Sequence, residues 1–175
     1  MSLLRYLLCL LLLLLCLGLL LNEMFNRKQV ATISLSATAL VALLLHEGYR
    51  ENAYTPVAGD VPTIGFGTTS GVKLGDRTSP EKALTVALRD VQRFEGSLKD
   101  CVTVPLHQHE YDAYISLSYN IGSNAFCRST LVRKLNTEDY TGACQEILRW
   151  DKFQGKPLAG LTKRRQEEHQ KCLGL

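Results

Sequence analysis

Two runs of apolar residues open the chain, and they differ in polarity. The first, 6–21, is almost pure leucine, whereas serine and threonine interrupt the second, 30–45. Each run is somewhat shorter than the roughly 20 residues that cross a bilayer comfortably as a helix. The second run is therefore compatible with a weak membrane anchor, with the first buried helix of a folded domain, or with one state after the other.

A segment rich in glycine and proline, 54–75, follows these runs. It contains strand-like pieces, chief among them 63–66, and predicts a small β lobe. Ser79, Pro80 and Glu81 then mark a helix start, because serine caps free amides, proline suits the first turn and a carboxylate favours the positive end of the helix dipole. We expect this helix to extend to about residue 99.

The predicted helix carries apolar residues at helical spacing, which indicates a core-facing stripe made of Leu84, Ala87, Leu88, Val91, Phe94 and Leu98. Similar patterns predict further helices over 107–121, 129–136, 141–149 and 162–172. The expected fold class is α+β, with a small β lobe, a larger helical lobe and one or two hydrophobic helices in front.

Charge gives little indication of a nucleic-acid partner. The 175 residues carry 20 basic and 17 acidic side chains, a formal net charge of +3. Three of the basic residues and one acidic residue precede residue 46, so 46–175 has 17 basic and 16 acidic side chains. Nucleic-acid binding normally needs a clustered basic face. The short basic cluster 163–165 is followed at once by Glu167 and Glu168, and we interpret it as a solvated helix face.

Four cysteines lie in the globular part, in no pattern with zinc-site spacing. An even set of this kind favours disulfides, and the alternative is four reduced, buried thiols in a cytosolic protein. Four cysteines allow three pairings. The preferred pairing joins Cys101 to Cys127 and Cys144 to Cys172.

The link between the two apolar runs carries Arg27 and Lys28, which the positive-inside rule places in the cytoplasm. The second run would then deliver the rest of the chain to the far side of the membrane. Neither run is followed by a clear small-x-small cleavage site. Met24 begins a charged start, MFNRKQV, that is itself suited to export. Residues 1–23 are therefore either an extension beyond the true start or an additional membrane helix.

Glu47 is the first candidate for chemistry. It follows three leucines at the end of the second apolar run, where partial burial disfavours the charged form of a carboxyl group. Cleavage of a glycosidic bond needs such an acid to protonate the leaving oxygen, together with a second carboxylate. A charged His46 would oppose this effect. Taken alone, a glutamate in this position is far more often an ordinary surface carboxylate at a helix end.

The run 46–69, HEGYRENAYTPVAGDVPTIGFGTT, resembles the catalytic segment of phage lysozymes of the glycoside hydrolase 24 type, EGxRxxAYxDxxGxxTIGYGHT. Two later blocks, 118–136 and 149–165, are similar to helical segments of that family in the same order, so the resemblance covers 46–172. It implies a lysozyme-like fold and a monomeric enzyme that hydrolyses the β-1,4 bond between N-acetylmuramic acid and N-acetylglucosamine in peptidoglycan. No metal or organic cofactor is implied, and no nucleic acid.

By this resemblance Glu47 is the general acid, and Thr63 helps to position the attacking water. The second carboxylate departs from the family pattern, because Pro56 stands where an aspartate is usual; Thr68 likewise stands where histidine is frequent. Asp60 is the acidic residue within the 54–63 loop, and we assign it the role of base or electrostatic stabiliser. The alternative is that Asp60 only shapes a turn.

The departure at Pro56 keeps two other functions open. A lytic transglycosylase needs only the acid and releases a 1,6-anhydro sugar, and a non-catalytic module would bind peptidoglycan or disrupt membranes.

Tyr119 and Asn120 are candidates for lining the sugar cleft, although aromatic residues at helical spacing more often belong to a core.

The serine, threonine and alanine content of the run before Glu47 resembles a signal-anchor-release segment. This resemblance implies an enzyme held on the periplasmic side of the host inner membrane. A holin or pinholin then depolarises the membrane and frees the enzyme into the periplasm. The expected domains are a leucine-rich segment 1–23, a signal-anchor segment 24–45 and a lysozyme-like muralytic domain 46–175.

Overall fold

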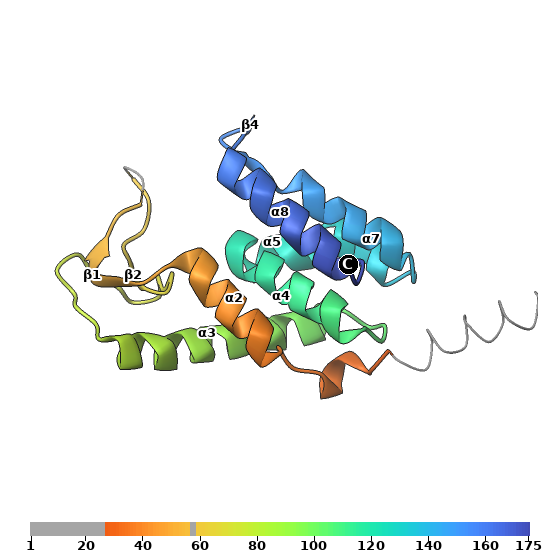
Figure 1. The fold of residues 1–175 in the computed structure, drawn as a ribbon, viewed down its shortest axis with the longest axis horizontal. Helices are drawn as coiled ribbons and strands as arrows, with labels where there is room; N and C mark the ends of the chain where they lie inside the picture. The colour runs from red at the N-terminus through yellow and green to blue at the C-terminus, as the bar shows by residue number, and fades with distance from the viewer. Residues whose placement is uncertain (1–26, 57–58) are drawn as a thin grey trace, which may run out of the picture.

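The computed structural model describes residues 27–56 and 59–175 (Figure 1). A small β lobe and a larger helical lobe are joined by one long helix, α3 (Pro80–Cys101). In the β lobe, β1 (Arg50–Tyr54) pairs antiparallel with β2 (Thr63–Gly65). The predicted α+β class and the division into two lobes are confirmed.

The helical lobe contains most of the remaining elements. Its α-helices are α2 (Ala37–Glu47), α4 (Gln108–Ile121), α5 (Ser123–Cys127), α6 (Thr130–Leu135), α7 (Tyr140–Glu146) and α8 (Ala159–Cys172). Short 3-10 helices are η1 (Val30–Thr32) and η2 (Ile147–Arg149), and a hairpin joins β3 (Lys152–Phe153) to β4 (Lys156–Pro157). The four downstream helices expected from the sequence are all present, whereas α5 and the β3–β4 hairpin were not predicted.

Helix α3 begins where its capping residues predict. The Ser79 hydroxyl accepts a hydrogen bond from the Lys82 amide at 3.4 Å, and Pro80 occupies the first turn. The predicted apolar stripe is wrong at Leu84 and Leu88, which are 46 % and 47 % exposed. The stripe is confirmed at Ala87, Val91 and Leu98, which are buried. Ala83 is buried in place of Leu84, because successive residues are turned by about 100° and only one narrow side of α3 is covered.

Helix α4 is the centre of the core and lies in the middle of the helical lobe in Figure 1. It packs most extensively against α8, and also against α2, α3 and α5. Its fully buried apolar side chains are Tyr111, Ala113, Tyr114, Ile115 and Leu117. Residues 110–115, 117 and 118 are all buried, so the helix holds a fixed position relative to the neighbouring helices.

Two disulfides tie the helical lobe together, and both match the predicted pairing. Cys101 at the end of α3 is bonded to Cys127 in α5, with Cα atoms 5.7 Å apart. Cys144 in α7 is bonded to Cys172 in α8, with Cα atoms 5.6 Å apart. Each bridge closes a loop of fewer than 30 residues (sequence separations of 26 and 28), and such a loop restricts the unfolded chain.

The second apolar run is packed onto the domain in this structure. Val30, Ile33 and Leu43 are buried in the core. The Ser36 hydroxyl donates to Asp112 in α4 at 2.6 Å, so the start of α2 is fixed to the core helix. Within the described residues, every helix is too short or too polar to span a membrane. The first apolar run lies outside the described residues.

Candidate active site

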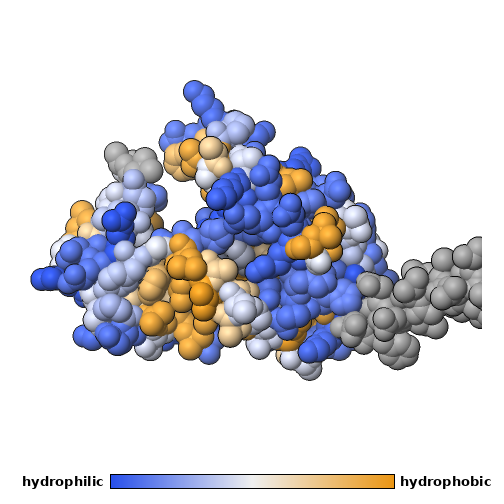
Figure 2. Space-filling view, in the orientation of Figure 1, coloured by the Kyte–Doolittle hydropathy of each residue, from blue (hydrophilic) through white to orange (hydrophobic). Residues whose placement is uncertain are grey.

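A cleft of about 460 Å³ separates the β lobe from the helical lobe. Figure 2 shows the surface hollowed between the two lobes, with the opening at the top of the view. The cleft is lined by β-lobe residues and by side chains of α2, α3 and α4, including Glu47, Pro56, Asp60, Thr63, Asp90, Arg93, Phe94, Tyr119 and Asn120. All three residues proposed from the sequence therefore face one cavity.

Glu47 reaches the cleft because α2 ends there. Gly48 has a φ of +68°, a conformation that favours glycine, and its amide donates to the Leu44 carbonyl at 3.0 Å to close the last turn. The chain then turns into β1 in the other lobe. The Glu47 side chain is 18 % exposed, so its carboxylate lies at the boundary between core and cleft.

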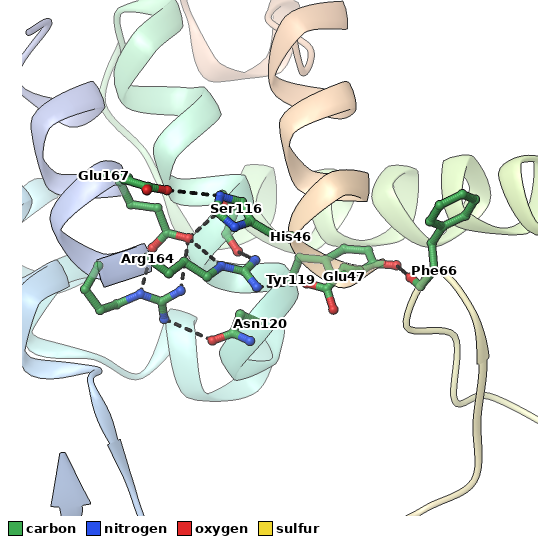
Figure 3. A network of polar contacts seen from close by, with 10 residues as sticks. His46, Glu47, Phe66, Ser116, Tyr119, Asn120, Arg164 and Glu167 are labelled. Carbon is green, nitrogen blue, oxygen red and sulfur yellow. Dashed lines mark hydrogen bonds and ion pairs between the residues drawn. The ribbon is translucent and has the colours of Figure 1, made fainter. Parts of the chain in front are cut away.

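Arg164 of α8 holds the Glu47 carboxylate from the helical side (Figure 3). Its Nη1 donates to Glu47 Oε1 at 2.9 Å, and its Nε donates to Glu168 Oε1 at 3.1 Å. The remaining Nη2 donates to the Ser116 carbonyl of α4 at 3.2 Å. Because the guanidinium plane is bonded on three sides, it fixes one oxygen of Glu47 in place.

Arg165, the next residue of α8, extends the same network to Asn120 of α4. Its guanidinium pairs with Glu168 Oε2 at 2.9 Å and donates to Asn120 Oδ1 at 3.1 Å. Burial lowers the pKa of Arg165, and the adjacent Glu168 carboxylate opposes that shift.

The interpretation of 163–165 as a solvated face is wrong for two of its three residues, since Arg164 and Arg165 are buried. Their partners lie one turn along α8 and on distant helices.

Asp60 and Thr63 lie on the β-lobe side of the cleft. Asp60 is exposed, and its Oδ1 accepts a hydrogen bond from the Val61 amide at 2.9 Å. Thr63 is buried at the start of β2, where its hydroxyl donates to the Val61 carbonyl at 3.2 Å. Pro56, which stands in place of the family's usual aspartate, lines the same cleft.

Several cleft residues were not assigned functions from the sequence. Asp90 of α3 is buried and accepts a hydrogen bond from the Thr68 hydroxyl at 2.9 Å. Tyr119, previously only a candidate for the cleft, donates to the Phe66 carbonyl at 3.0 Å. Residues three and four apart on a helix face each other, as Arg165 and Arg164 face Glu168. This spacing could have predicted the arginine pairs from the sequence, but no such signal exists for Asp90 or Tyr119.

Comparisons with known proteins agree with this geometry. The phage lysozyme family model matches residues 45–168. An endolysin of Acyrthosiphon pisum secondary endosymbiont phage 1 is 42 % identical over 138 residues, covering 77 % of this chain and 94 % of that protein. The SAR-endolysin of Pseudomonas phage phiKMV is 38 % identical over 141 residues, covering 78 % of this chain and 87 % of that protein. Among solved structures, the muramidase domain of SpmX from Asticaccaulis excentricus has a TM-score of 0.73 at 29 % identity, covering 80 % of this chain and 97 % of that one. The chain therefore belongs to the phage lysozyme family and is a peptidoglycan-hydrolysing glycosidase of the lysozyme type.

Proposed function

We propose that the chain is an endolysin in which Glu47 is the general acid that protonates the glycosidic oxygen between N-acetylmuramic acid and N-acetylglucosamine. The observation that carries the proposal is the placement of the Glu47 carboxylate at the cleft wall, with Oε1 held by Arg164. Family membership supports the reaction class.

In the proposed reaction, Asp60 and Thr63 act from the other side of the sugar. Asp60 accepts a proton from water, and the water oxygen bonds to the anomeric carbon as the bond to the leaving oxygen breaks. The leaving oxygen takes its proton from Glu47, so the anomeric configuration is inverted. Thr63 orients the water. Such a mechanism needs a space of about 6.5 to 9.5 Å between the two carboxyl groups.

The test of Asp60 is an Asp60→Asn variant assayed on purified peptidoglycan. We expect its rate to fall about 100-fold or more, because removal of a general base typically costs that much. Mass spectrometry of the wild-type digest should show reducing N-acetylmuramic acid ends. If the variant retains its rate, Asp60 is not the second carboxylate. If the wild-type products are 1,6-anhydro sugars, a transglycosylase that uses a single acid takes the place of the hydrolase.

We extend the proposal to regulation by the second apolar run, 30–45, as a signal-anchor-release segment. The name of the phiKMV relative supports this. In this structure the run supplies the buried Leu43 and the bond from Ser36 to Asp112, and it ends two residues before Glu47. A run embedded in the inner membrane would leave the core without these contacts. The tethered enzyme is therefore inactive until a holin or pinholin depolarises the membrane and the enzyme enters the periplasm.

A Ser34→Leu, Thr38→Leu variant tests this regulation. Both residues are exposed in the folded domain, so the change should spare the core while raising the membrane affinity of the run. We expect the wild type to leave the membrane fraction and gain activity after an uncoupler is added, and the variant to remain bound and inactive. Full wild-type activity in energised membranes would contradict the proposal. The same release measurement on a chain that starts at Met24 is the control for an effect of residues 1–23.

A further inference from the structure

The turn that follows β2, Phe66–Thr68, is held by two helices, α4 and α3. On one side the Tyr119 hydroxyl of α4 donates to the Phe66 carbonyl at 3.0 Å (Figure 3). On the other side the Thr68 hydroxyl donates to the buried Asp90 carboxylate of α3 at 2.9 Å. Both bonds come from helices, so the position of this turn depends on the helical lobe as well as on the short β1–β2 sheet.

The middle residue of the turn, Gly67, lies against the Glu47 carboxylate. A Cβ atom at this position would stand 2.9 Å from Glu47 Oε2, and the backbone has a φ of +83°. Arg164 binds the other oxygen, Oε1. The carboxylate therefore lies between a fixed guanidinium on one side and the glycine backbone on the other, and the turn sets the space available to Oε2.

Tyr119 is suited to hold the turn. Its ring packs against Phe94 with centroids 5.0 Å apart, which fixes the ring at the cleft wall. Burial raises the pKa of the Tyr119 phenol, and the carboxylates of Asp90 and Glu47 raise it further. The phenol therefore remains protonated and can donate to the Phe66 carbonyl throughout the working pH range.

We propose that Tyr119 is a positioning residue for catalysis: its hydroxyl holds the Phe66–Thr68 turn so that Gly67 keeps Glu47 Oε2 aligned for proton transfer. This inference rests on the proposed role of Glu47 as the acid. Tyr119 acts through the turn and not through the substrate, so its hydroxyl matters to the chemical step more than to sugar binding.

Tyr119→Phe is the test, because it removes the hydroxyl and keeps the ring. On soluble peptidoglycan oligosaccharides we expect kcat to fall about tenfold, with KM changed less than about twofold, since a misaligned catalytic group lowers turnover without weakening substrate binding. The matched control is Tyr140→Phe, which removes a phenol that donates to the Pro105 carbonyl at 3.2 Å outside the cleft. Both variants should lose a similar amount of thermal stability, and only Tyr119→Phe should lose turnover.

A second variant, Gly67→Ala, perturbs the same contact directly, because its Cβ displaces Glu47 Oε2. It should also lower kcat, and combining it with Tyr119→Phe should lower kcat by less than the product of the two separate fold-losses.

Equal kcat values for Tyr119→Phe and Tyr140→Phe would overturn the inference, as would an effect confined to KM. A Glu47→Gln variant measured alongside separates the two proposals: if it stays active, the assignment of the acid is wrong, whereas an inactive Glu47→Gln with an unimpaired Tyr119→Phe refutes only the role of Tyr119.

Discussion

Replacing Glu47 by glutamine is expected to lower the rate of peptidoglycan hydrolysis by about 1000-fold or more. The amide has nearly the shape of the carboxyl group but no proton to give to the leaving oxygen, and a lost general acid typically costs between about 100-fold and 10,000-fold. The fold should survive. The amide oxygen can still accept the bond from Arg164 Nη1, and Arg164 keeps its partners Glu168 and Ser116. Loss of turbidity of permeabilised Gram-negative cells measures the rate, and the thermal midpoint reports folding.

Glu51→Gln is the matched control for this prediction. Glu51 lies on β1, four residues from Glu47, and its carboxylate pairs with Arg77 at 2.6 Å on the exposed surface. The same chemical change there should leave the rate of hydrolysis within about twofold of the wild-type rate, because exposed ion pairs contribute little to the stability of the fold. A Glu47→Gln enzyme as active as Glu51→Gln would show that the proton comes from another group.

Local sequence signals predicted the helices well. Ser79 and Ser129 both cap helices, and their side chains accept bonds from the amides of Lys82 and Val132. Such caps depend on residues three apart, so they are readable from the sequence. The β3–β4 hairpin has only two residues in each strand, and α5 has five residues. Elements this short give too little periodicity to detect.

The candidate site was only partly predictable. Glu47 and Thr63 were identified through an ordered motif, and the structure places both at one cleft with Asp60. Arg164 was assigned to solvent because its chain neighbours are mostly charged. It is instead buried against Glu47, which precedes it by 117 residues, and no local pattern encodes so distant a contact. Tyr119 and Phe66 are joined across the two lobes in the same way.

The burial of Arg164 and Arg165 leads to the largest expected effect on stability. Both guanidinium groups share the carboxylate of Glu168, which is itself 4 % exposed and also accepts a bond from the Ser116 hydroxyl at 2.6 Å. Taking charges out of water is costly, and only close pairing offsets that cost. Glu168 pairs with both adjacent arginines and Glu47 pairs with Arg164, so these two carboxylates supply the negative charge that allows the arginines to be buried.

Glu168→Gln should lower the free energy of unfolding by about 3 to 5 kcal/mol, because removing one partner of a buried ion pair leaves the other charge uncompensated. Glu167→Gln is the matched control one residue away: Glu167 is 46 % exposed and pairs with His46 at 3.4 Å and Lys163 at 3.9 Å. Such surface pairs are worth about 0 to 1 kcal/mol.

Urea denaturation of the two variants measures the difference, provided that the dependence of the unfolding free energy on urea concentration is unchanged. A loss of 3 to 5 kcal/mol would be a large share of the roughly 5 to 15 kcal/mol typical of a whole domain. Glu168→Gln should also lower activity, since Arg164 loses the bond that orients it toward Glu47. Equal stabilities for Glu168→Gln and Glu167→Gln would mean that the buried arginines are compensated by groups other than Glu168.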